Sequence, residues 1–216
     1  MKKVLITGAS SGIGKCIYDS YKALPGYKVI GVSRRGPDYI FNFAYGGRNK
    51  FFHRLIEKEG EVLLIINCAG VMPLVEGGMY DCRFIMDVNF WAVVHSMEAF
   101  GKFPKTCIIN IASTSAFSPD EHQPIYAASK AALLAATAAY AKRYATFNTR
   151  VNAISPGFIK SNLVEGETPL QLIDKIPLKY ESEPDVIFQA CRFIENCDYI
   201  TGSNIIIDGG LLCRTL

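Results

Sequence analysis

Two kinds of segment alternate along the chain. Short runs of β-branched and other apolar residues predict strands at residues 4–6, 28–32, 39–43, 62–66, 106–111, 150–154 and 204–207. Longer stretches between them predict helices at residues 15–23, 48–59, 80–98, 127–145 and 183–195. Strands that alternate with helices favour an α/β fold, in which a parallel sheet is covered by helices on both faces.

The connection between the second and third predicted strands is short. Only residues 33–38 separate them, whereas a parallel crossover normally takes a dozen or more residues and usually contains a helix. Six extended residues reach roughly 20 Å, barely enough to return along a short strand. We therefore expect the helix after the second strand to be missing.

Composition limits the classes of function. The 216 residues are expected to form a single domain, and a net charge of +3 with no basic run longer than Arg34-Arg35 argues against nucleic acid. Seven cysteines without a Cys-x-x-Cys pair indicate reduced thiols, without a metal site. The longest apolar stretch, residues 62–75, contains an Asn and a Pro, and the N-terminal apolar run is too short for a signal peptide. We expect a cytoplasmic protein that does not bind membranes.

A glycine-rich loop follows the first predicted strand. Residues 7–14 read Thr-Gly-Ala-Ser-Ser-Gly-Ile-Gly and lead into a predicted helix. Glycines let the backbone approach a phosphate, and a helix N-terminus presents free N–H groups. A plain strand-to-helix turn is the alternative, but three glycines within seven residues favour a phosphate cradle. Its candidate residues are Gly8, Ser10, Ser11, Gly12, Ile13 and Gly14.

Tyr126 and Lys130 lie four residues apart at the start of an Ala-rich helix. Residues at this spacing share one helix face. A cation beside a phenol favours the phenolate and lowers its pKa from about 10, which would make the pair an acid/base device. Alone, the spacing also occurs by chance on exposed helices.

Together, the glycine-rich loop and the Tyr–Lys pair resemble the nucleotide-binding segment and catalytic pair of the short-chain dehydrogenase/reductase family. The resemblance extends over residues 4–210 and implies a doubly wound parallel sheet, the Rossmann fold. Asn67-Cys68-Ala69-Gly70 is similar to the family's Asn-Asn-Ala-Gly segment, with Cys68 interpreted as an inert packed thiol. Further cofactor contacts implied by the resemblance are Asn42, Phe43, Asn67, Ala69, Gly70, Tyr126, Lys130, Pro156, Gly157, Ile159 and Ser161.

The resemblance also implies a catalytic set of Asn89, Ser113, Tyr126 and Lys130. Ser113 precedes the tyrosine by thirteen residues, as in the family, and Ser115 is the alternative. Asn89 matches the family's catalytic Asn, although an Asn bonded to neighbouring backbone is a fair rival interpretation. The implied reaction moves a hydride between NADP(H) and a small carbonyl or alcohol substrate, with Tyr126 as acid/base.

The residues after the second strand bear on the choice of cofactor. A carboxylate there binds the adenosine ribose of NAD, whereas an arginine accommodates the 2′-phosphate of NADP. Ser33, Arg34 and Arg35 occupy this place, and the first acid is Asp38. Arginine is the natural fork for a phosphate, so NADP(H) is favoured over NAD(H). The alternative is that Asp38 folds back to the ribose.

The sequence leaves alternative functions open. An NADP(H)-binding sensor or scaffold without turnover is the alternative function. Sugar-nucleotide epimerases share the Tyr–Lys pair but need a larger C-terminal domain than this chain offers. Residues 162–181 are placed as a substrate lid. The family commonly forms homodimers or homotetramers through helices that correspond here to residues 80–98 and 126–145.

Overall fold

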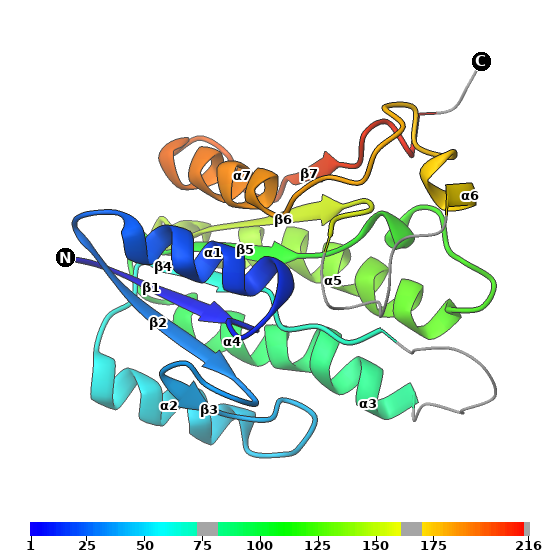
Figure 1. The fold of residues 1–216 in the computed structure, drawn as a ribbon. Helices are drawn as coiled ribbons and strands as arrows, with labels where there is room; N and C mark the ends of the chain where they lie inside the picture. The colour runs from blue at the N-terminus through cyan, green and yellow to red at the C-terminus, as the bar shows by residue number, and fades with distance from the viewer. Residues whose placement is uncertain (73–81, 161–169, 214–216) are drawn as a thin grey trace.

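The computed structural model describes residues 1–72, 82–160 and 170–213. Its strands form one seven-stranded sheet in the order β3-β2-β1-β4-β5-β6-β7, and all neighbours are parallel (Figure 1). The predicted doubly wound sheet is confirmed. The strands are β1 (Lys2–Thr7), β2 (Tyr27–Ser33), β3 (Tyr39–Ile40), β4 (Leu64–Asn67), β5 (Cys107–Ile111), β6 (Arg150–Pro156) and β7 (Asn204–Ile207).

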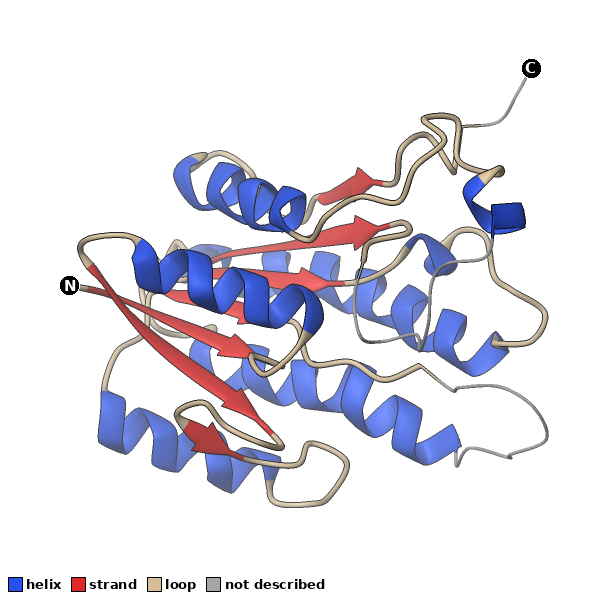
Figure 2. Ribbon diagram, in the orientation of Figure 1, coloured by secondary structure: helices blue, strands red, loops and turns tan. Residues whose placement is uncertain are grey.

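Helices cover both faces of the sheet (Figure 2). Helices α1 (Gly12–Ala23) and α7 (Asp185–Asn196) pack on one face, and α2 (Arg48–Glu59), α4 (Ala92–Phe100) and α5 (Pro124–Tyr144) pack on the other. Shorter helical segments are α3 (Cys82–Met86), the π-helical turn η1 (Asp87–Trp91), η2 (Thr114–Ala116), η3 (Ala145–Phe147) and α6 (Leu170–Ile173). No helix in the described ranges is long and apolar enough to cross a membrane.

The strands supply both cores because successive side chains of a strand point to opposite faces. Leu5 and Ile65 belong to the core beneath α2, α4 and α5, whereas Val4, Ile6 and Ile66 belong to the core beneath α1 and α7. This burial on both faces explains why the central strands read as continuous apolar runs in the sequence.

The helix expected to be absent between β2 and β3 is absent: residues 34–38 form only a turn with one isolated bridge. The third strand is shorter than predicted, because Tyr39–Ile40 pairs only with Val32 and Ser33 at the end of β2. The chain therefore returns along only two residues of its neighbour. This small return explains how so short a crossover can join parallel strands.

A buried carboxylate, Glu195, joins helix α7 to the first residues of strands β1 and β2, at the amino ends of the strands. The hydroxyls of Tyr21 and Tyr27 each donate to the Glu195 carboxylate at 2.9 Å. Lys2 Nζ lies 2.7 Å and Arg192 Nη1 2.6 Å from its oxygens. Burial alone would raise the pKa of Glu195, but bonds from Lys2 and the tyrosines hold it below its ordinary value of 4.5.

We expect the Glu195→Gln substitution to lower the free energy of unfolding by about 1–3 kcal/mol at pH 7, because a charged acceptor of several hydrogen bonds is lost. The pKa of the Glu195 carboxylate is lowered in the folded protein. Its contribution to stability is therefore complete above pH 4.5 and is lost as the pH falls through the pKa of the folded state. Denaturant unfolding should therefore show that the free energy of unfolding falls less between pH 7 and pH 3 in the variant than in the native protein. Parallel pH curves for the two proteins would contradict this role.

Candidate active site

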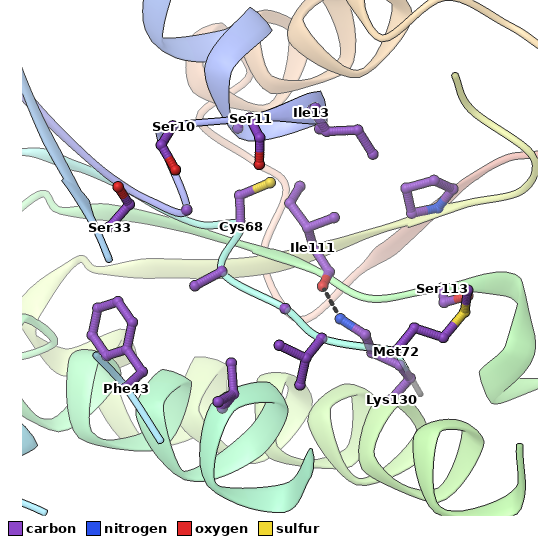
Figure 3. Close-up of a pocket in the computed structure, with 18 of the residues that line it drawn as sticks. Ser10, Ser11, Ile13, Ser33, Phe43, Cys68, Met72, Ile111, Ser113 and Lys130 are labelled. Atoms are coloured by element: carbon purple, nitrogen blue, oxygen red, sulfur yellow. Dashed lines mark hydrogen bonds between the residues drawn. The ribbon is translucent and has the colours of Figure 1, made fainter. Parts of the chain in front are cut away.

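A cavity of about 370 Å³ lies at the carboxyl ends of the strands. It is bounded by the loops after β1, β2, β4, β5 and β6 and by the start of α5 (Figure 3). This is the place where ligands bind in doubly wound sheets, because the connections of β1 and β4 run in opposite directions from the switch point. The sequence-predicted residues that line it are Gly8, Ser10, Ser11, Gly12, Ile13, Gly14, Ser33, Arg34, Asn42, Phe43, Ala69, Gly70, Ser113, Tyr126, Lys130, Pro156, Gly157 and Ile159.

The glycine-rich loop is held by close backbone contacts. Gly8 has a φ of +75°, and a Cβ there would lie 2.8 Å from the backbone of Ala69. A Cβ on Gly14 would lie 2.2 Å from the carbonyl oxygen of Gly8. Thr7 Oγ1 accepts hydrogen bonds from the amides of Cys68 and Ala69, both at 3.1 Å. The loop after β1 thus packs directly on the loop after β4.

The N-terminus of α1 opens toward this cavity. Ser11 is its N-cap but makes no side-chain capping hydrogen bond, and the first turn carries no acidic residue. Ser11 and Gly12 both line the cavity. Free N–H groups and the positive end of the helix dipole therefore face a space in which a phosphate could bind.

Tyr126 and Lys130 lie together on one face of α5, as predicted, and both are buried. Lys130 Nζ lies 5.7 Å from the centroid of the Tyr126 ring and donates to the carbonyl oxygen of Ile111 at 3.0 Å (Figure 3). Burial lowers the pKa of Lys130 to about 8.

The prediction that the tyrosine has a lowered pKa is wrong for the site in this structure. Burial raises the pKa of Tyr126, and a hydrogen bond with Ser113 opposes the rise. The cause is desolvation: a phenolate would lose its hydration here, and the lysine ammonium is directed at a backbone carbonyl instead of the phenol oxygen.

Ser113, rather than Ser115, lines the cavity. Its Oγ accepts a hydrogen bond from the amide of Ser115 at 3.1 Å, and the two hydroxyls also lie 3.1 Å apart. Ser113 is the N-cap of η2, so the start of this short helix fixes the rotamer of its hydroxyl. Ser115 therefore orients Ser113.

Asn89 is buried beneath the cavity and does not line it. Its side chain accepts from the amide of Val71 at 2.8 Å and donates to the Val71 carbonyl at 2.9 Å and to Ser129 Oγ at 3.1 Å. The rival interpretation from sequence, an Asn bonded to neighbouring backbone, therefore describes its contacts. These bonds tie the π-helical turn η1 to the loop after β4 and to α5.

The two candidates for the ribose end of the cavity lie apart. Arg34 lines the cavity and its exposed side chain has no hydrogen bond or ion pair with the described part of the chain. The Asp38 carboxylate instead accepts from the Gly31 amide at 2.7 Å and does not line the cavity. Arg35 does not line it either. The position of Asp38 therefore does not fit a ribose contact.

Of two further predicted contacts, the structure turns one away from the cavity and does not describe the other. Asn67 Nδ2 donates to Asn110 Oδ1 at 2.9 Å inside the sheet layer, so the side chain is turned away. Ser161 lies outside the described residues, as do residues 162–169 of the segment 162–181 that the sequence predicts to be a lid.

Sequence reasoning missed several apolar lining residues. Cys68 was interpreted as an inert thiol, and burial raises its pKa to about 12, which agrees. The others carry no polar signal, and only their places at strand ends or beside Asn89 could have indicated them. The missed lining residues are Phe41, Cys68, Val71, Phe84, Val88, Ile111 and Ala112. Within the described ranges, no cluster of three His, Cys, Asp or Glu side chains could hold a metal ion.

Comparison with known proteins agrees with this geometry. The family model described as Enoyl-(Acyl carrier protein) reductase matches residues 47–212. The 3-oxoacyl-[acyl-carrier-protein] reductase FabG of Thermotoga maritima is 30% identical, with 98% of each chain covered. The chain belongs to the short-chain dehydrogenase/reductase family. Carbonyl reductase family member 4 of Xenopus tropicalis is 27% identical, with 97% of this chain and 98% of the relative covered.

Solved structures of short-chain dehydrogenase/reductases share the fold over the whole chain. A 4-hydroxyisoleucine dehydrogenase complexed with NADH is 27% identical, with a TM-score of 0.86 and all of both chains covered. A blue fluorescent protein from a metagenomic library, in complex with NADPH, is 25% identical, with a TM-score of 0.87 and 98% of each chain covered. By family, the protein is an oxidoreductase.

We expect the Gly14→Ala variant to lose nucleotide binding, because its methyl group would overlap the Gly8 carbonyl and push α1 away from the loop. Calorimetric titration with NADPH would measure the loss, and thermal unfolding would report any loss of stability. Gly46→Ala is the matched control, since a Cβ there meets nothing within 4 Å. Equal nucleotide affinities in the two variants would show that the close contact between Gly14 and Gly8 is not needed for nucleotide binding.

Proposed function

We propose that this protein is an NADP(H)-dependent oxidoreductase that transfers a hydride between the cofactor and a carbonyl or alcohol substrate. The observation that carries the proposal is the convergence of Ser113, Tyr126 and Lys130 on the same cavity as the glycine-rich loop. In a protein of this family, that arrangement supports a cofactor site and a proton donor side by side.

The chain offers a matching partner for each part of a nicotinamide dinucleotide. The uncapped start of α1 suits the pyrophosphate. Arg34 suits a ribose phosphate, and Gly157 and Ile159, which line the same cavity as Lys130, are proposed to contact the nicotinamide. The bound cofactor would supply the hydride, and the protein would supply orientation and electrostatics.

Tyr126 is proposed to give its proton to the substrate oxygen as a carbonyl is reduced. Because burial raises its pKa, the phenol holds its proton at neutral pH, which is the form that donation requires. Ser113, oriented by Ser115, would donate a hydrogen bond to the same oxygen and stabilise its developing charge. Lys130 would bind a cofactor hydroxyl and, through its positive charge, stabilise the phenolate that Tyr126 becomes when it gives up its proton.

The proposed preference for NADP(H) depends on Arg34. A guanidinium pairs well with a 2′-phosphate, and the side chain of Arg34 has no other ionic partner in the described ranges. The carboxylate that would select NAD is turned to the Gly31 amide. The relatives do not decide the matter, since one carries NADH and another NADPH.

A paired titration with NADPH and NADH, followed by fluorescence of Trp91, tests this preference. We expect tighter binding of NADPH, and we expect Arg34→Asp to weaken it roughly tenfold or more while NADH affinity does not fall, because only NADPH carries the phosphate. Arg35→Asp is the matched control, with the same change of charge at a residue that does not line the cavity. Tighter binding of NADH would refute the preference, and binding of neither nucleotide would refute the cofactor proposal.

The Tyr126→Phe variant tests turnover. We expect loss of carbonyl reduction by roughly 100-fold or more, because the proton donor is removed, with NADPH affinity nearly unchanged. Tyr140 lies on the same helix as Tyr126, and its hydroxyl bonds to Glu98 of α4, so Tyr140→Phe should keep full activity. Steady-state assays against a panel of ketones provide the measurement. Full activity of Tyr126→Phe would refute the mechanism, and NADPH binding without turnover by the native protein would favour a sensor.

A further inference from the structure

A buried arginine lies behind one wall of the cavity. Arg48 is the first residue of α2, and its side chain is only 10% exposed. Its Nη2 lies 2.7 Å from Asp87 Oδ1, and its Nε donates to the carbonyl oxygen of Phe43 at 2.8 Å. A guanidinium in this position is desolvated, so it needs both of these acceptors.

The two acceptors belong to separate parts of the cavity wall. Phe43 lines the cavity itself. Asp87 begins the π-helical turn η1, in which the next residue, Val88, also lines the cavity. One guanidinium therefore fixes the distance between the segment after β3 and the turn η1.

This fastening matters because of the short crossover. Strand β3 has only two residues, and no helix packs between β2 and β3. In the described chain, Arg48 supplies the only side-chain hydrogen bond to segment 41–47 from outside it. The rings of Phe41, Phe43 and Phe51 add packing, with the first and last stacked at 4.2 Å between centroids. Aromatic rings packed against one another can slide, whereas the two directed polar contacts of Arg48 fix the position of the segment.

We propose that Arg48 is a positioning residue for the adenosine half of the cofactor: it holds the wall formed by Phe43 and Val88 at the separation that this half requires. The inference rests on the proposed function, because it needs a dinucleotide in the cavity. Arg48 does not touch the ligand. It acts through the Phe43 carbonyl and the Asp87 carboxylate.

The guanidinium geometry explains why arginine is needed. Its planar fork presents separate N–H groups to two acceptors, whereas a lysine ammonium is a single point charge. A lysine at this position can keep the pair with Asp87 but cannot also reach the Phe43 carbonyl in the same geometry. Arg48→Lys should therefore keep the ion pair with Asp87 and lose the hydrogen bond to the Phe43 carbonyl.

Binding of two half-cofactors tests the proposal. The probes are adenosine 2′,5′-bisphosphate and reduced nicotinamide mononucleotide, titrated calorimetrically into the 216-residue protein. We expect Arg48→Met to weaken binding of the adenosine probe roughly tenfold, with Arg48→Lys intermediate, and to change affinity for the nicotinamide probe by less than about twofold. Arg54→Met, an exposed arginine of the same helix, is the matched control and should change neither.

Each other outcome overturns the proposal. Equal weakening of both probes would mean that Arg48 only stabilises the fold, and an unchanged affinity for the adenosine probe would mean that it positions nothing. If Arg48→Met does not fold, Arg48→Lys and Asp87→Asn carry the same comparison. If the native protein binds neither probe, the proposed function fails as well. If it binds both and the Arg48 variants match it, only the present inference fails.

Discussion

The candidate site depends on one close approach, between the backbone of the glycine-rich loop and the loop after β4. A Cβ at Gly8 would lie 2.8 Å from Ala69, and one at Gly14 would lie 2.2 Å from the Gly8 carbonyl, so neither position has room for a side chain. Thr7 closes the contact with its two hydrogen bonds to the loop after β4. Because Gly8 and Gly14 place no side chain at this contact, a ligand at the switch point can approach the start of α1 closely.

A second constraint is the set of buried polar groups beneath Tyr126 and Lys130. An Asn in an apolar core is costly unless its amide is bonded, and Asn89 makes three bonds to two other segments. The π-helical turn adds a residue to the helical path at this point, as such turns often do near functional sites. The same bonds that satisfy Asn89 hold α5, and hence the Tyr–Lys pair, against the loop after β4.

Much of the fold and of the site could be predicted from sequence because local rules decide it. The apolar runs predicted the strands, and α2 and β7 have the predicted bounds. The spacing of Tyr126 and Lys130 predicted that they share a face. Side-chain direction at longer range could not be predicted: Asn67 turns into the sheet layer, and Asp38 turns to a backbone amide.

The direction in which the pKa of Tyr126 shifts could not be predicted from the sequence, for the same reason. Its sign depends on the balance between desolvation and a nearby cation, and sequence spacing gives only the cation. In the structure, Lys130 donates its hydrogen bond to the Ile111 carbonyl, and the desolvation of Tyr126 outweighs the opposing effect of its hydrogen bond with Ser113. The role of Arg48 could not be predicted from the sequence either, since a buried ion pair is recognised only when the positions of both side chains are known. The short crossover was predictable from chain length, but what takes the place of its helix was not: α2 supplies both the aromatic packing and the guanidinium that fasten segment 41–47.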